Sequence, residues 1–234
     1  MRRHFEREME LLKRSLVILG TAVEEAVHKA FLAFRRRDAI LAREVIEGDT
    51  EIDRLEVNTE EECLKALALH QPVANDLRFV VTALKITDEL ERIGDLASNI
   101  AYRAISIAGR PPVEPDFSFD EMTSRTLWMV KQAINCLINA DADLARAVWM
   151  ADDEVDLLHN RAQEVIKDEI RAQPEHLDSL VDWLVVERFT ERTADQAKSI
   201  AKDVLYMVEG EIVRHRSAEV RAWFELRQGE NGTD

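Results

Sequence analysis

The sequence contains the same pattern twice, and this repetition limits the folds that the chain can adopt. Residues 48–55 align with 151–158 at an offset of 103, Gln71-Pro72 with Gln173-Pro174 at 102, and 91–95 with 191–195 at 100. Because the offset drifts so little, we expect one structural unit to occur twice in tandem.

Each unit is predicted to be helical. The 234 residues include only 7 glycines and 5 prolines, fewer than half of what an average soluble protein contains. Apolar residues between Phe5 and Ala30 recur at alternating spacings of four and three, which is typical of a long amphipathic helix. The same reasoning predicts six long helices, over about 5–36, 38–69, 75–108, 120–140, 141–171 and 177–210.

The one proline-dense stretch, Gly109 to Pro115, falls almost at the middle of the sequence and predicts a boundary between the two units. We therefore expect an all-α protein made of two tandem, duplicated three-helix bundles with a short C-terminal helical tail. The expected divisions are a first bundle at 1–109, a linker at 110–116, a second bundle at 117–210 and the tail at 211–234.

Charge and composition exclude several classes of function. The formal net charge of −15 argues against nucleic-acid binding. The apolar run Leu16–Val23 is too short to span a membrane, and no targeting segment is visible. Cys63 and Cys136 lie inside helical patterns, so we expect two buried free thiols and a cytoplasmic location. Phosphate-binding glycine loops and a GxSxG nucleophile turn are absent from the sequence, so we expect no nucleotide site and no serine nucleophile of those types.

The third and sixth predicted helices carry a stripe that begins apolar and ends acidic. In the third helix the stripe consists of Leu77, Val81, Leu84, Asp88, Glu91 and Asp95, and the sixth helix repeats it from Leu177 to Asp195. A neighbouring stripe stays apolar, comprising Ile86, Leu90, Ile93, Ala97, Ile100 and Ala104. We expect the apolar stripe to hold the helix against its partners.

Acidic residues four apart lie on one face of a helix. If the second and third helices of each unit pack antiparallel, two acidic pairs converge, and such a cluster needs a cation. The predicted ligands are Asp49, Asp53, Glu91 and Asp95 in the first unit, and Asp152, Asp156, Glu191 and Asp195 in the second. Carboxylate ligands favour iron, manganese, magnesium or calcium. The alternative is a solvated acidic face paired with neighbours such as Arg54, Arg92 and Arg192.

Segments 42–53, 71–78 and 90–101 closely resemble the PhoU family, above all in Gln71-Pro72-Val73-Ala74-Asn75-Asp76-Leu77-Arg78 and Leu90-Glu91-Arg92-Ile93-Gly94-Asp95. The resemblance implies a cytoplasmic, non-catalytic regulator that restrains the phosphate-starvation response when phosphate is plentiful. It implies contact with the ATPase of a phosphate ABC transporter and with a sensor histidine kinase. It also implies self-association as a homodimer and metal binding through the same eight carboxylates.

This chain departs from the family pattern after the last aspartate of the motif, where Leu96 and Gln196 replace the usual histidine. Without an imidazole, zinc is less favoured than iron, manganese or magnesium. Arg78, Arg92 and Arg192 are candidates for orienting the carboxylates.

Two other readings of the sequence stay open. One is a ferritin-like carboxylate protein, for which the sequence offers Glu25-x-x-His28 and a loose Asp156-x-x-His159. The other is a metal-free helical adaptor.

Overall fold

The computed structural model describes residues 2–210, and side chains from residue 5. Six long helices account for nearly all of this range. They are α1 (Arg2–Arg36), α2 (Ala39–His70), α3 (Ala74–Ala108), α4 (Phe119–Asn139), α5 (Ala142–Ala172) and α6 (Leu177–Glu209), with a short 3₁₀ turn at Pro174–His176. The predicted C-terminal tail, 211–234, lies outside the described residues.

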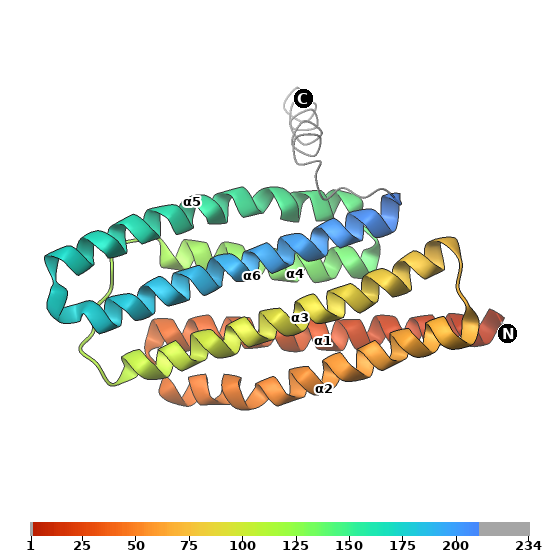
Figure 1. Ribbon diagram of the computed structural model, residues 1–234, viewed down its shortest axis with the longest axis horizontal. Coiled ribbons are helices and arrows are strands. Elements are labelled where there is room, and N and C mark those ends of the chain that lie inside the picture. Colours follow the sequence, from red (N-terminus) through yellow and green to blue (C-terminus); the bar gives the residue numbers. More distant parts are fainter. Residues whose placement is uncertain (1, 211–234) are drawn as a thin grey trace, which may run out of the picture.

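The helices form two elongated three-helix bundles that lie side by side (Figure 1). The first bundle contains α1, α2 and α3, and the second contains α4, α5 and α6. Helices α3 and α6 pack against each other along the middle of the molecule and run in opposite directions. The predicted fold class, two tandem all-α three-helix units, is confirmed.

Equivalent residues start the second helix of each unit. Asp38 accepts hydrogen bonds from the backbone N–H groups of Ile40 and Leu41 at 2.9 and 3.0 Å, and Asp141 accepts one from Leu144 at 2.9 Å. These carboxylates satisfy N–H groups that a helix leaves without partners at its first turn. The repeat thus includes the N-cap residues of α2 and α5, at the turn after the first helix of each unit.

One apolar core runs through both bundles. The predicted apolar stripe of α3, from Ile86 to Ala104, is fully buried. At the end of the molecule where the linker passes, an aromatic group packs in edge-to-face and tilted contacts with ring centroids 4.7–5.9 Å apart; it consists of Phe34 of α1, Phe117, Phe119 of α4 and Trp183 of α6. The Trp183 indole N–H donates to the Val113 carbonyl at 2.9 Å, which fixes the linker to this aromatic group.

A buried carboxylate also joins the two units. Asp182 of α6 is 3% exposed and accepts hydrogen bonds from Arg103 (3.2 Å) and Ser106 (2.8 Å) at the end of α3 and from Arg110 (2.9 Å) just beyond it. The aromatic group thus holds α6 against α1, α4 and the linker, and the polar network holds α6 against the end of α3.

The stripe that leads to the carboxylates is less buried than its pattern suggested. Leu77 and Val81 precede the acidic residues of this stripe on α3, and Leu77 is 40% exposed. On α6, Val181 of the equivalent stripe is 42% exposed. These stripes therefore lie at the edge of the core. Cys63 and Cys136 are buried free thiols as predicted, and burial raises the pKa of each to about 12. Among the helices of residues 2–210, none has a stretch sufficiently long and apolar for a membrane span.

Candidate metal centre

The first acidic cluster lies where α2 passes antiparallel to α3. Asp49 and Asp53 come from α2, and Glu91 and Asp95 come from α3. Gly94 allows this close approach, because a Cβ added there would lie 3.1 Å from Ile52 Cγ2 and 3.6 Å from Asp49 Oδ1. The residues that sequence reasoning placed together in the first unit are therefore neighbours across one helix pair.

Two of these carboxylates, Asp49 and Glu91, have raised pKa values. Partial burial raises the pKa of Asp49, and the charges of Asp53 and Asp95 raise it further, against the opposing effect of the Ser98 hydroxyl. Burial likewise raises the pKa of Glu91, with Asp95 and Asp53 adding to the shift. Within residues 5–210, no lysine, arginine or histidine forms an ion pair with any of the four. The first cluster carries negative charge that its own surroundings leave uncompensated.

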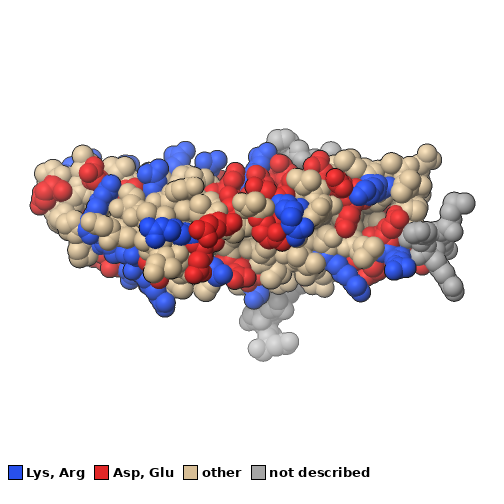
Figure 2. All heavy atoms as spheres, turned by 90° about the horizontal axis from the view of Figure 1, so that it is seen from below, with Lys and Arg blue, Asp and Glu red and all other residues tan. Residues whose placement is uncertain are grey.

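The arginines next to these acids point elsewhere. Arg54 binds Glu51 at 2.5 Å and Arg92 binds Asp88 at 3.1 Å, both on the exposed surface. Arg54 and Arg92 therefore do not neutralise the predicted ligands of the first unit. Acidic side chains gather near the middle of the face that Figure 2 shows, with basic groups distributed among them.

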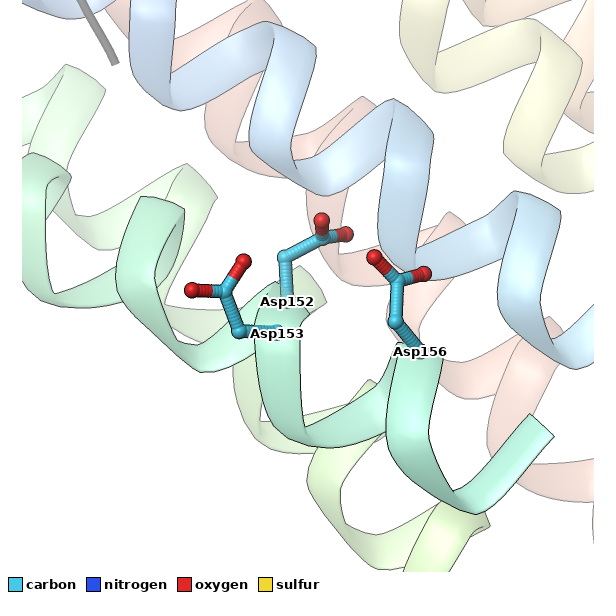
Figure 3. Close-up of side chains that lie close together, drawn as sticks. All are labelled: Asp152, Asp153 and Asp156. Carbon is cyan, nitrogen blue, oxygen red and sulfur yellow. The ribbon is translucent and has the colours of Figure 1, made fainter. Parts of the chain in front are cut away.

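In the second unit, three carboxylates of α5 come together. One oxygen each of Asp152, Asp153 and Asp156 lies within 4.8 Å of the other two, and Asp152 and Asp156 point toward α6 (Figure 3). Asp153 was not among the predicted ligands. Its place beside Asp152 in the sequence was the available signal, but the first unit has Thr50 at that position.

This second cluster already contains a cation. The Lys198 ammonium of α6 donates a hydrogen bond to Asp152 Oδ2, and the Asp152 side chain is 2% exposed. Burial lowers the pKa of Lys198, but Asp152, Asp195 and Asp156 shift it the other way by more, so the pKa is raised and the amine stays charged. Lys198 was not singled out from the sequence, although its counterpart at an offset of 100 is the uncharged Ser98.

Other acidic side chains of the second unit are also buried or partly buried between α5 and α6. Burial raises the pKa of Glu191 to about 7, with Asp195 and Asp156 contributing. One turn earlier on α6, Glu187 is fully buried, and burial raises its pKa to about 7 despite a hydrogen bond with His159 of α5. His159 also contacts Gln163 at 3.2 Å. Sequence reasoning missed Glu187.

Other predicted roles differ from the structure. Arg78 does not orient the carboxylates: it binds Asn75 at 2.6 Å and lies against Gly210 at the end of α6. Glu25 pairs with Lys29 at 2.6 Å on the surface of α1, so Glu25-x-x-His28 does not join any acidic cluster. Leu96, at the position of the missing histidine, is buried. The orienting role suggested for Arg192 stays a prediction.

The two clusters thus differ in what they can hold. Hard cations prefer carboxylate oxygens and neutralise like charges that would otherwise repel one another. The first cluster supplies four carboxylates without a protein cation, which suits a hard metal ion in charge and in donor type, but within residues 5–210 the group whose ligand oxygens already lie within 4.8 Å of one another is Asp152, Asp153 and Asp156. The second cluster already holds an ammonium group against its most buried carboxylate, so its residues do not fit one in this arrangement.

Comparison with known proteins assigns both units to one family. The model of the "PhoU domain" family matches residues 16–104 and again 119–204. These two matches cover most of the chain and fall on the two bundles.

Curated relatives match over most of their length. A phosphate-specific transport system accessory protein PhoU homolog of Aquifex aeolicus is 37% identical over 210 residues, covering 90% of this chain and 95% of that protein. The corresponding homolog of Pseudomonas aeruginosa is 35% identical and covers 90% of this chain and 88% of the relative.

Solved structures have the same architecture. The crystal structure of PhoU from Pseudomonas aeruginosa aligns with a TM-score of 0.84 and 34% identity, over 88% of this chain and 100% of that one. The phosphate transport system regulatory protein PhoU from Streptococcus pneumoniae aligns with a TM-score of 0.79 and 26% identity, over 89% and 99%.

Proposed function

This chain belongs to the PhoU family, and from that membership we propose that it regulates phosphate transport in the cytoplasm, without catalysing a reaction. The observation that carries the proposal is the match of both units to the PhoU domain, in order and over nearly all of the described helices. The relatives named as accessory or regulatory proteins of phosphate transport support the same role.

The proposed partners are the ATPase subunit of a phosphate ABC transporter and a sensor histidine kinase of the phosphate-starvation response. Contact with both would allow the protein to restrain the response when phosphate is plentiful. The protein is proposed to act as a homodimer. Its elongated paired bundles offer long helical faces to such partners.

The first acidic cluster is the proposed metal centre. Asp49, Asp53, Glu91 and Asp95 would hold iron, manganese or magnesium, and the bound ion would neutralise the cluster and join α2 to α3. The uncompensated negative charge at Asp49 and Glu91 supports this assignment. The exposed oxygens of Asp53 and Asp95 can turn toward an ion at little cost because solvent surrounds them.

The test is a tagged pull-down from phosphate-replete cells of the source organism, with co-purifying proteins identified by mass spectrometry. We expect the native chain to recover the transporter ATPase, the sensor kinase or both. A phosphate-starvation reporter should be active without phosphate limitation when the chain is deleted. A well-folded, abundant chain that recovers neither protein and whose deletion leaves the reporter silent would refute the regulator proposal.

The role of the first cluster needs its own variant. Glu91→Gln with Asp95→Asn removes two charges while keeping side-chain size. We expect this variant to fold, to lose bound manganese and to weaken recovery of the partners at least several-fold. Glu47→Gln is the matched control, since Glu47 is an exposed carboxylate on α2 close to Asp49. Equal recovery of partners with all three chains would favour the metal-free adaptor instead.

A further inference from the structure

The acidic clusters of the two repeats differ at one position that faces them. Glu91, Asp95 and Ser98 of α3 correspond at an offset of 100 to Glu191, Asp195 and Lys198 of α6. Both Ser98 and Lys198 follow the last aspartate of the motif by three residues, so each side chain lies on the same helix face as that aspartate. The repeat thus places a neutral hydroxyl beside one cluster and an ammonium group beside the other.

The contacts of these two side chains follow that difference. Ser98 is buried beside Asp49 and brings no charge. Lys198 reaches across from α6 to α5 and donates to Asp152 Oδ2. Asp152 is the most buried of the three α5 carboxylates, which group their oxygens within 4.8 Å of one another. The ammonium group therefore sits where the second cluster concentrates its negative charge.

A metal ion cannot share this position with the ammonium group. A charged lysine has three donors and no acceptor, so it cannot be a ligand, and its charge repels an approaching dication. Moving Lys198 away would leave a charged amine without Asp152 in a half-buried position, which costs free energy that the metal would have to supply. The lysine is tethered to the chain, so its local concentration does not depend on the metal supply.

We propose that Lys198 is the resident cation of the second cluster and excludes metal ions from the second repeat, so that the chain binds metal only in the first repeat. The exclusion by Lys198 stands on the contacts of α5 and α6, whereas the statement about the first repeat rests on the metal centre proposed above. The two repeats then have different functions: the first responds to metal, and the second has a fixed internal ion pair.

Reciprocal exchange of the two equivalent residues tests the proposal. Lys198→Ser gives the second cluster the residue of the first, and Ser98→Lys does the reverse. Bound manganese per chain is measured by elemental analysis after dialysis against excess MnCl2. We expect Lys198→Ser to bind more manganese per chain than the native protein, through one additional site. We expect Ser98→Lys to lose the manganese that the native protein binds. Lys167→Ser, which removes a positive charge from the surface of α5, should leave the content unchanged.

Loss of Lys198 leaves Asp152 buried without its partner, so a second variant guards against a folding defect. Lys198→Gln keeps a long side chain that can donate to Asp152 but removes the charge. Thermal unfolding with and without MnCl2 should show a larger manganese-dependent rise in midpoint for Lys198→Ser and Lys198→Gln than for the native chain. Asp152→Asn combined with Lys198→Ser should abolish that gain.

Two results would overturn the proposal. One is that neither lysine variant binds more manganese than the native chain. The other is that a chain with Asp49→Asn and Asp53→Asn in the first cluster, but with Lys198 intact, still binds manganese and loses it when Asp152→Asn is added. If the pull-down recovers neither partner and the reporter stays silent while Lys198→Ser still gains manganese, the regulator proposal alone is refuted, so the two failures are distinguishable.

Discussion

At the scale of single residues, Glu187 is the side chain whose burial has the clearest thermodynamic consequence. It is fully buried between α5 and α6, and its hydrogen bond with His159 does not offset the loss of water. Burial therefore raises the pKa of Glu187 to about 7. The folded chain holds a proton at this position that the unfolded chain has already released at neutral pH.

This proton makes stability depend on pH in a defined direction. The folded state binds the proton more tightly, so its stabilising effect is complete below about pH 4.5 and is lost as pH rises to about 7. We expect unfolding by urea in the presence of a chelator to show a loss of roughly 1–3 kcal/mol over that interval. Glu187→Gln should reduce the slope, whereas Glu175→Gln, an exposed control, should not. An identical slope in the native chain and Glu187→Gln would contradict this account.

At the scale of helices, the contact between α2 and α3 has a compensated counterpart between α5 and α6. Gly94 packs against Ile52 in the first repeat, and Ala194 and Val155 occupy the equivalent positions in the second. In the first repeat the extra methyl group is on Ile52 of α2, whereas in the second repeat it is on Ala194 of α6. The two helix pairs thus fill the same space with different side chains.

Exchanging these residues should reveal their coupling. Gly94→Ala alone brings a Cβ to about 3 Å from Ile52, so the overpacking cost of about 1–3 kcal/mol should exceed the gain of about 0.5–1 kcal/mol in helix propensity. Ile52→Val on its own should cost stability, but when it is added to Gly94→Ala it should recover more than that cost. A double-mutant cycle measured by chemical denaturation should give a coupling free energy of at least about 0.5 kcal/mol. Simple additivity of the two changes would show that the helices adjust without strain.

The sequence predicted the helices better than the contacts between them. Apart from the start of α1, helix ends fall within one residue of prediction, and Asp38, Asp141 and Gly210 mark three of them locally. The pairing of Lys198 with Asp152 depends on the rotation of α6 against α5, which periodicity within one helix does not determine. Arg78 was wrongly assigned for a simpler reason: at 1.5 Å per residue it lies roughly 25 Å along α3 from Asp95.

At the scale of the whole molecule, Asp182 and the aromatic group around Trp183 join the repeats into one cooperative unit. Both sets of contacts link α6 to elements of the first repeat. We expect tryptophan fluorescence and far-ultraviolet circular dichroism to report one coincident thermal transition, although the described tryptophans all lie in the second repeat. Two separate transitions in the native chain would show that the repeats unfold independently.

Removing the charge of Asp182 should weaken this junction. Asp182→Asn leaves Arg103 and Arg110 without their shared anion, although both arginines are partly solvated. We therefore expect a loss of about 1–3 kcal/mol, less than for a fully buried pair. Asp178→Asn, exposed one turn earlier on α6, is the control and should change the unfolding midpoint little. An unchanged midpoint for Asp182→Asn would mean that apolar packing alone joins the repeats.

The antiparallel arrangement of α3 and α6 places the two repeats as the subunits of a symmetric dimer would lie, but within one polypeptide (Figure 1). In a dimer of identical chains, every substitution appears on both sides of the axis. Here each side is encoded separately, so a lysine can enter one cluster while the other keeps its serine. Because the two repeats are encoded separately, their side chains need not be symmetric. One repeat can lose its response to the surroundings while the other retains it, so the molecule has a functional asymmetry that its backbone alone does not have.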